Sequence, residues 1–220
     1  MKFLKAKLTF NEEVLGMSPS NPDLYREYIA SKAPNPTTVE DEIEAIGVEG
    51  VVEKAKTIFP RNKDGKPCIF NYQLKGYLKG AAGFMRTASG SLSKTVKNYK
   101  KRINGNFFII ERMIPFEDYD EIGECPRPLR ADTPQGERNA LANSETIPAG
   151  ATLTFTIVCL NNDDIKVLKE WLDFGFMSGI GQWRNSGKGV FDWEELPFGE
   201  EDFNNLPPDW KKMAETLGWK

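Results

Sequence analysis

The sequence predicts an α+β domain, in which strand and helix patterns alternate along a single chain. Residues 2–10 alternate between apolar and polar side chains, which is the period of a strand with one buried face. Residues 152–193 combine, in order, a strand pattern, an amphipathic helix, a glycine-rich loop and a short strand. With 220 residues, including 14 Phe, 5 Trp and 6 Tyr, the chain is long enough to bury a sizeable core.

The first third of the chain contains one strand signal and several helix signals. The side chains of residues 2–10 that should face the core are Leu4, Ala6, Leu8 and Phe10. Residues 21–32 begin with Asn-Pro-Asp, which is typical of a helix N-terminus, and residues 38–58 predict two helical pieces. Residues 60–67, which begin and end with proline, predict a turn.

Two basic helices are predicted in the middle of the chain, over residues 69–86 and 91–103. The buried stripe of the first helix consists of Leu74, Leu78, Ala81 and Met85. On a third face, another backbone element could approach closely because the residues there are Gly76, Gly80 and Gly83. The apolar stripe of the second helix consists of Leu92, Val96, Tyr99 and Ile103. Alternatively, residues 69–76 are extended and the first helix is shorter.

The remaining segments complete the expected organisation. Residues 106–114 predict a strand, whereas residues 115–150 show little periodicity and predict a long loop or short strands that the pattern does not reveal. Residues 197–220 predict an acidic tail that ends in a short amphipathic helix. We therefore expect one domain over residues 1–196, with an insertion at about 87–150, followed by the tail.

The composition excludes several classes of enzyme. The chain has no histidine, which removes the Ser-His-Asp triad, the Cys-His dyad, His-ligated zinc and the HExxH proteases. Its three cysteines, Cys68, Cys125 and Cys159, are far apart and form no CxxC pair, so we expect free thiols in a reducing compartment. No apolar run approaches the roughly 18 residues of a membrane span, and residues 1–10 predict a strand rather than a signal peptide. We expect neither a metal nor a cofactor.

The charge of the chain is concentrated in one basic segment. Residues 61–112 carry twelve basic and only two acidic side chains, a net charge of +10 in a chain whose total is −3. Such an asymmetry is typical of a one-sided surface for nucleic acid, although a solvated lysine-rich face would have the same composition.

The glycine-rich loop is the most specific motif. Residues 179–191 contain two Gly-x-Gly pairs, Gly179 with Gly181 and Gly187 with Gly189, separated by five residues that include Arg184. Glycines permit left-handed backbone and close approach, and their N–H groups can form a concavity for an anion. The alternative is a tight helix-to-strand turn with packing glycines. The loop matches neither a P-loop nor a dinucleotide-binding turn.

This pattern resembles the signature GhGxxxxxGhG, with h hydrophobic, of the RAMP (repeat-associated mysterious protein) superfamily of CRISPR systems. Lys188 departs from it, because the signature has a hydrophobic residue there. Residues 69–86 are similar to the LKG segment before the first long helix of many RAMP backbone subunits. Residues 128–136 also resemble uncharacterised phage and prophage proteins. The resemblance implies a ferredoxin-like (RRM-like) core with the loop between its last helix and last strand.

The resemblance further implies a protein that binds single-stranded RNA, or single-stranded DNA, along its phosphate backbone. Its partners would be the strand and CRISPR-type subunits or further copies of the chain, in the antiviral defence of a prokaryotic cytoplasm, encoded by the host or by a phage. The expected nucleic-acid contacts are Lys75, Lys79, Arg86, Lys94, Lys97, Lys101, Arg127, Arg130, Arg138, Arg184 and Lys188, beside the four loop glycines. Stacking candidates are Tyr72, Tyr99, Phe107, Phe108 and Trp183, most of which we expect in the core.

Two other functions stay open. The first is a metal-independent endoribonuclease like the repeat-processing RAMP members, or a metal-dependent one in which Asp23 or Asp132 would be formal candidates. No spacing assigns a catalytic residue, and an isolated aspartate is more often a cap or a turn residue. The second is a phage protein that acts through protein–protein contacts, as an inhibitor or an assembly subunit, using the acidic segment at 40–53 and the tail.

Overall fold

The computed structural model describes residues 1–20, 56–133 and 136–218, and within these ranges the side chains of residues 128–141 are not part of the description. The helices predicted over residues 21–32 and over most of 38–58 therefore lie outside the described residues. The last three residues of that second prediction, Lys56–Ile58, form strand β4 instead of a helix.

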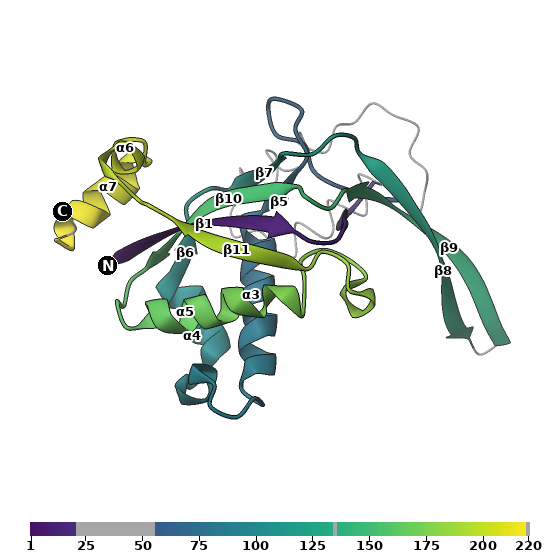
Figure 1. Ribbon diagram of the computed structural model, residues 1–220, viewed down its shortest axis with the longest axis horizontal. Coiled ribbons are helices and arrows are strands. Elements are labelled where there is room, and N and C mark those ends of the chain that lie inside the picture. The colour runs from purple at the N-terminus through teal and green to yellow at the C-terminus, as the bar shows by residue number, and fades with distance from the viewer. Residues whose placement is uncertain (21–55, 134–135, 219–220) are drawn as a thin grey trace.

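A six-stranded sheet forms the centre of the molecule (Figure 1). Its order is β11 (Phe191–Leu196), β1 (Lys2–Phe10), β10 (Thr152–Cys159), β7 (Met113–Glu117) and β5 (Cys68–Phe70), and β6 (Phe107–Ile109) also pairs with β10. All these pairings are antiparallel. Because β10 and β11 both run antiparallel to β1, they are parallel to each other, and the chain between them forms helix α5 (Asp164–Asp173). The strand–helix–loop–strand order predicted for residues 152–193 is confirmed.

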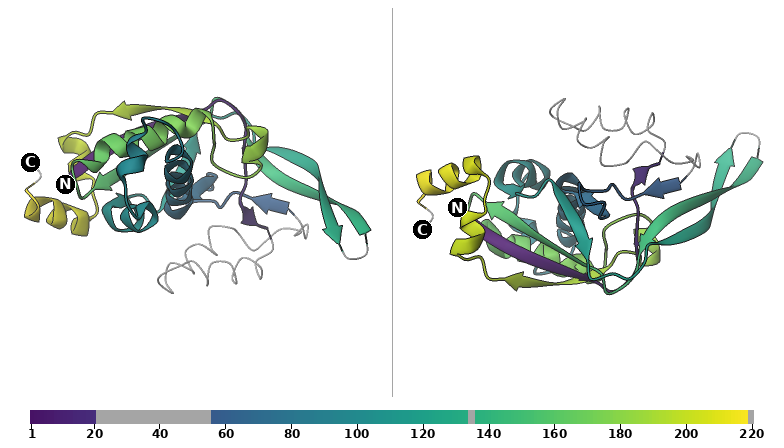
Figure 2. Two further views of the ribbon diagram at one scale, coloured as in Figure 1. Left: turned by 90° about the horizontal axis from the view of Figure 1, so that it is seen from below. Right: turned by 90° about the horizontal axis from the view of Figure 1, so that it is seen from above.

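The core lies between this sheet and the helices on one of its faces. Figure 2 shows α3 (Asn71–Met85), α4 (Tyr99–Asn106) and α5 on the same side of the sheet. The side chains of β1 predicted to face the core, Leu4, Ala6, Leu8 and Phe10, are at most 1% exposed. From the helices, Leu74, Leu78 and Trp171 enter the same cluster. The alternation of β1 and the apolar stripes of α3 and α5 thus meet in one core.

The helix predicted over residues 91–103 is wrong in part, because the segment is interrupted. A 3₁₀ turn, η1 (Leu92–Thr95), precedes α4, and Asn98 between them has left-handed backbone with φ of 48°. The Glu170 carboxylate on α5 accepts the N–H groups of Leu92 and Ser93. The hydroxyl of buried Ser93 also accepts a hydrogen bond from the Trp171 indole at 2.8 Å. These bonds turn Ser93 inward and leave Leu92 43% exposed, contrary to the predicted apolar stripe.

A long hairpin replaces the loop that the region after residue 115 suggested. β8 (Gly123–Thr133) and β9 (Gly136–Ile147) pair antiparallel along their whole length and extend away from the body (Figures 1 and 2). At its base, β9 joins a second sheet with β2 (Val14–Leu15), β4 and β3 (Ser18–Pro19). The sequence of the hairpin lacks the sustained alternation of apolar and polar side chains by which a strand with one buried face is predicted.

The C-terminal segment folds against the end of the sheet opposite the hairpin (Figure 1). It forms α6 (Glu200–Asn204) and α7 (Pro208–Thr216), the second of which is the predicted terminal helix. Phe198 stacks on Phe3 of β1, with ring centroids 4.5 Å apart. Asp202 forms an ion pair with Lys5 at 2.7 Å. Across the described ranges, no helix is both long enough and apolar enough to cross a membrane.

Candidate nucleic-acid interface

The glycine-rich loop folds back on itself between η2 (Phe174–Phe176) and β11. The N–H of Ile180 donates to the carbonyl of Gly189 at 2.9 Å, which places the two Gly-x-Gly pairs side by side. A Cβ atom on Gly179 would lie 2.0 Å from the carbonyl carbon of Gly189, and a Cβ on Gly189 would lie 1.9 Å from the Ile180 oxygen. Neither position can accept a side chain, so the pairing of the backbone requires both glycines.

The same loop is fixed to the segment that follows β1. The N–H of Gly189 donates to the carbonyl of Glu13 at 2.9 Å. Gly181 has φ of +105°, and a Cβ there would lie 2.9 Å from the Leu15 carbonyl oxygen. At Gly187, by contrast, φ is +79° and nothing lies within 4 Å of the Cβ position. Close packing therefore explains why Gly179, Gly181 and Gly189 carry no side chain. At Gly187 only the left-handed backbone favours glycine.

The tip of the loop carries an exposed cation. The 3₁₀ turn η3 (Arg184–Ser186) forms the tip, and Arg184 is exposed there. A pocket of about 530 Å³ separates this loop from the first turns of α3. Its cationic side chains are Arg184 and Lys79, and its other lining residues are Met17, Tyr72, Gln73, Gly76, Tyr77, Ile180 and Gly181. The structure thus brings Lys79, predicted in the basic helix over residues 69–86, together with Gly181 and Arg184 of the glycine-rich loop.

The glycines of α3 open this pocket along the helix. Nothing lies within 4 Å of a Cβ built on Gly76 or on Gly80, whereas a Cβ on Gly83 would meet the Tyr99 hydroxyl at 3.1 Å. Among the residues that the structure describes, no backbone element makes the expected close approach to Gly76 or Gly80. Each glycine inside a helix costs about 1 kcal/mol relative to alanine. For Gly76 and Gly80 no contact with the described part of the protein offsets that cost.

Tyr72 and Gln73 also line the pocket, although the sequence analysis did not predict that they share a site. Residues 72, 73, 76 and 79 lie on one side of α3, which helical spacing could have indicated once the start of the helix was known. The Gln73 side chain accepts the Phe70 N–H at 2.7 Å, which fixes it at the start of α3. Tyr77 donates to the carbonyl of Trp171 at 2.7 Å, and burial raises the pKa of its phenol. Tyr77 is therefore a structural wall of the pocket.

Arg127 and Lys188 are engaged inside the protein. Arg127 is 6% exposed and donates to the Ser144 hydroxyl at 2.8 Å and to the Gln182 side-chain carbonyl at 2.5 Å. Lys188 forms ion pairs with Glu13 at 3.0 Å and Glu12 at 3.2 Å. The hydrogen bond with Glu13, more than the attraction of Glu12, raises the pKa of the Lys188 ammonium. These placements favour structural roles over the phosphate contacts predicted for both.

The remaining predicted cations divide into internal and exposed ones. Arg86 donates to the Val96 carbonyl at 2.5 Å and lies over the Tyr99 ring. Lys75 lies 4.8 Å from the centroid of the Phe108 ring, and burial, together with Lys79, lowers its pKa. The exposed cations of this group are Lys94, Lys97 and Lys101, of which the last lines a different, open pocket of about 490 Å³. Arg130 and Arg138 belong to β8 and β9, and their side chains lie outside the described residues.

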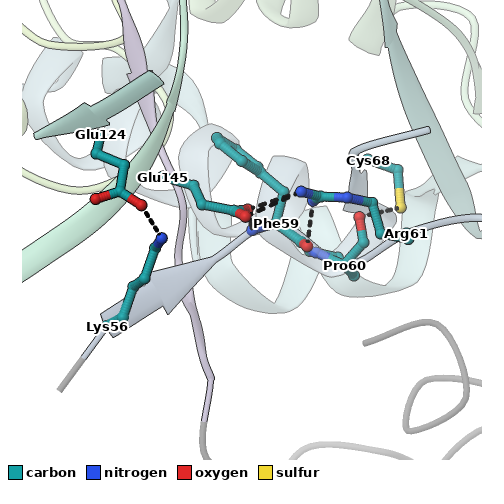
Figure 3. A network of polar contacts seen from close by, with 7 residues as sticks. All are labelled: Lys56, Phe59, Pro60, Arg61, Cys68, Glu124 and Glu145. Carbon is teal, nitrogen blue, oxygen red and sulfur yellow. Dashed lines mark hydrogen bonds and ion pairs between the residues drawn. The ribbon is translucent and has the colours of Figure 1, made fainter. Parts of the chain in front are cut away.

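Several arginines of the basic segment are neutralised within the fold. The Arg61 guanidinium donates to both carboxylate oxygens of Glu145, at 3.0 and 3.1 Å (Figure 3). Glu145 also accepts the Phe59 N–H at 2.9 Å, and Lys56 forms an ion pair with Glu124 nearby. These contacts tie the chain before β5 to the base of the hairpin. Arg102 is paired with buried Asp164 in the same manner. The positive charge that this segment presents to a ligand is therefore smaller than its net charge of +10.

Comparisons with known proteins identify a backbone likeness only. No protein-family model and no curated protein matches the sequence. The chain is similar to a chain of the "Cryo-EM structure of the Type III-B Cmr-beta bound to cognate target RNA", with 12% identity and a TM-score of 0.49, over 89% of this chain and 60% of that one. It is also similar to a chain of a "Type IV-B CRISPR Complex", with 12% identity and a TM-score of 0.44, over 93% of this chain and 98% of that one. Both TM-scores are below 0.5, so the function proposed below rests on the residues of this chain.

Proposed function

We propose that this protein binds a single strand of nucleic acid, RNA rather than DNA, in the pocket between α3 and the glycine-rich loop. One observation carries the proposal. Two cations from distant parts of the chain, Lys79 and Arg184, line one pocket, in which Gly76 leaves the backbone of α3 without a side chain at its own position. Bare helix backbone lets a ligand approach closely, and the cations supply the charge that holds phosphate.

The surroundings of the two cations support this role. Neither Lys79 nor Arg184 forms an ion pair with any residue that the structure describes, whereas Lys188 on the same loop is held by two glutamates. A cation that is already paired inside the protein gains little from a phosphate. Among the residues that the structure describes, none of those that line the pocket is a carboxylate. The pocket therefore favours an anion over a metal or a cationic ligand, and it favours binding over carboxylate-dependent cleavage.

We also propose a ferredoxin-like core for the domain. In chain order, β1, α3, β6, β10, α5 and β11 give the pattern βαββαβ, and their order in the sheet is β11, β1, β10, β6. The glycine-rich loop then lies between the last helix and the last strand, as the RAMP resemblance implies. In this proposal the hairpin β8–β9 elaborates a domain of residues 1–196, and the protein is an RNA-binding subunit of a CRISPR-type assembly.

The test is binding of a labelled single-stranded RNA of random sequence, followed by fluorescence anisotropy at several salt concentrations. The double variant Lys79→Ala, Arg184→Ala should bind at least tenfold more weakly, and the log–log salt slope should become shallower by roughly 0.7 for each phosphate that the variant no longer neutralises. The matched control is Lys212→Ala, which removes an exposed cation from α7 at the end of the molecule opposite the hairpin (Figure 1).

Two outcomes would contradict the proposal. If the double variant bound RNA as tightly as the control variant, the pocket would not be the binding site. If single-stranded DNA of the same sequence bound more tightly than RNA, the preference for RNA would be wrong. Electrophoresis of the recovered RNA, with and without magnesium, would also show whether the strand is cut, which the endoribonuclease alternative requires.

A further inference from the structure

A row of residues on α3 leads from the pocket to an exposed aromatic side chain. Gly76, Gly80 and Phe84 follow one another at intervals of four residues, so they lie along the same side of the helix. Eight residues of helix span about 12 Å. A Cβ on Gly80 would meet nothing within 4 Å among the residues that the structure describes, so the helix surface at this step of the row is open.

Phe84 is the most exposed large apolar side chain in the part of the chain that the structure describes, at 63%. Its ring stacks on Phe174, with centroids 6.1 Å apart and planes 25° from parallel. Phe174 begins η2, which contacts α3 and directly precedes the glycine-rich loop. The next apolar residues, Phe176 and Met177, are both 62% exposed. One face of the Phe84 ring is thus supported by protein, while most of the side chain is in solvent.

Such a cluster requires an explanation, because exposed large apolar side chains that adjoin one another mark interaction sites. Phe84 contributes little to the packing of the core, because most of its side chain is exposed. Trp183, the aromatic residue singled out in the loop, is different. It is 44% exposed and lies against the guanidinium of Arg127, 5.7 Å from its ring centroid. It is therefore already engaged by a cation of the protein.

We infer that Phe84, supported by Phe174, is a stacking platform for the bases of the strand whose backbone lies in the pocket. This inference rests on the proposed function, because the platform is continuous with the glycine row that leaves that pocket. Stacking on an aromatic ring tolerates any base, because every base has a π face. The platform would add affinity for bases to a site that otherwise recognises only phosphate.

The test separates bases from phosphates with two labelled probes of equal length. One is a 12-nucleotide oligouridine, and the other is an abasic ribose-phosphate strand with the same number of phosphates. Wild-type protein should bind oligouridine more tightly than the abasic strand. Phe84→Ala should weaken binding of oligouridine by about tenfold and leave binding of the abasic strand unchanged. Phe84→Tyr should restore wild-type binding, and Leu217→Ala, which removes another exposed apolar side chain just after α7, should bind both probes like wild type.

Three results would overturn the platform, and they differ from failure of the proposed function. Phe84→Ala could bind both probes like wild type, which would remove its role and leave the pocket intact. It could lose affinity equally for both probes, which would indicate a change in the phosphate site. It could bind RNA normally and lose self-association in sedimentation, which would assign the patch to a protein interface. If wild-type protein bound neither probe, the proposed function itself would be wrong.

Discussion

The guanidinium of Arg127 lies 5.7 Å from the centroid of the Trp183 ring and donates a hydrogen bond to the neighbouring Gln182. Its other contact, to the Ser144 hydroxyl, reaches across to β9. Arg127 itself belongs to β8, so this single side chain joins both strands of the hairpin to the glycine-rich loop. Trp183 has left-handed backbone with φ of 56°, which is uncommon for a residue other than glycine. We conclude that Arg127 positions the turn from which Arg184 reaches the pocket.

We therefore expect Arg127→Ala to destabilise the protein rather than to remove a phosphate contact. The substitution removes two bonds that the guanidinium donates, one to the buried Ser144 hydroxyl, which keeps its hydrogen bond with Thr57, and one to the Gln182 side chain. Each such bond contributes about 1.5–3 kcal/mol, and 1 kcal/mol corresponds to about 2–4 °C in Tm for a domain of this size. Thermal unfolding should show a fall of several degrees. Arg184→Ala, at an exposed position, should melt within about 1 °C of wild type. Equal melting temperatures for both variants would contradict this assignment.

Two glycines of the loop should respond differently to alanine. At Gly187 the added Cβ meets nothing within 4 Å, so only the left-handed backbone resists it, at a cost of about 1–2 kcal/mol. At Gly189 the Cβ would lie 1.9 Å from the Ile180 oxygen, and the backbone pairing of the loop would have to break. We expect Gly187→Ala to fold and Gly189→Ala to unfold at a much lower urea concentration. A Gly189→Ala protein as stable as Gly187→Ala would show that the loop can rearrange freely.

The exposed lysines around α4 offer a test of long-range charge. Lys94, Lys97 and Lys101 are exposed, so changing all three to glutamate should leave the Tm nearly unchanged. The change of six charges should nevertheless weaken RNA binding strongly at low salt and less at high salt, because exposed charges are screened. Anisotropy titrations at about 50 and 300 mM salt would measure this. Unchanged affinity at both concentrations would confine the interface to the pocket.

The comparison of sequence and structure shows which patterns are informative. The alternation of β1 and the stripe of α5 were predictable because each element buries one face against the core. The 3₁₀ turn at Leu92–Thr95 was not, because its first residues are held by Glu170, which is distant in the sequence. The pocket was predictable only in part. Lys79 and Arg184 stand out as cations near unusual glycines, but their meeting depends on how the loop packs against α3. Residue types alone do not indicate that Lys188 forms ion pairs or that Arg127 is buried.

The half-buried carboxyl of Glu111 should make the stability of the protein depend on pH. Burial raises the pKa of Glu111 above its usual 4.5, although the Thr156 N–H donates to it at 2.9 Å and the charge of Lys5 opposes the shift. Between pH 4.5 and the higher pKa of the folded state, the folded protein binds more protons than the unfolded chain. The contribution of Glu111 to stability is therefore fully present below pH 4.5 and is lost as the pH rises through the folded pKa.

Glu111→Gln should remove this dependence, because the amide oxygen can still accept the Thr156 N–H and cannot ionise. Urea unfolding at pH 4, 5.5 and 7 should show a variant that is more stable than wild type at pH 7, with a difference that shrinks towards pH 4. That difference can change by at most about 1.4 kcal/mol for each pH unit inside the window. Asp192→Asn, on the exposed edge strand β11, is the matched control and should show no such trend. A Glu111→Gln protein that is less stable than wild type at pH 7 would mean that the ionised carboxylate, paired with Lys5, stabilises the fold.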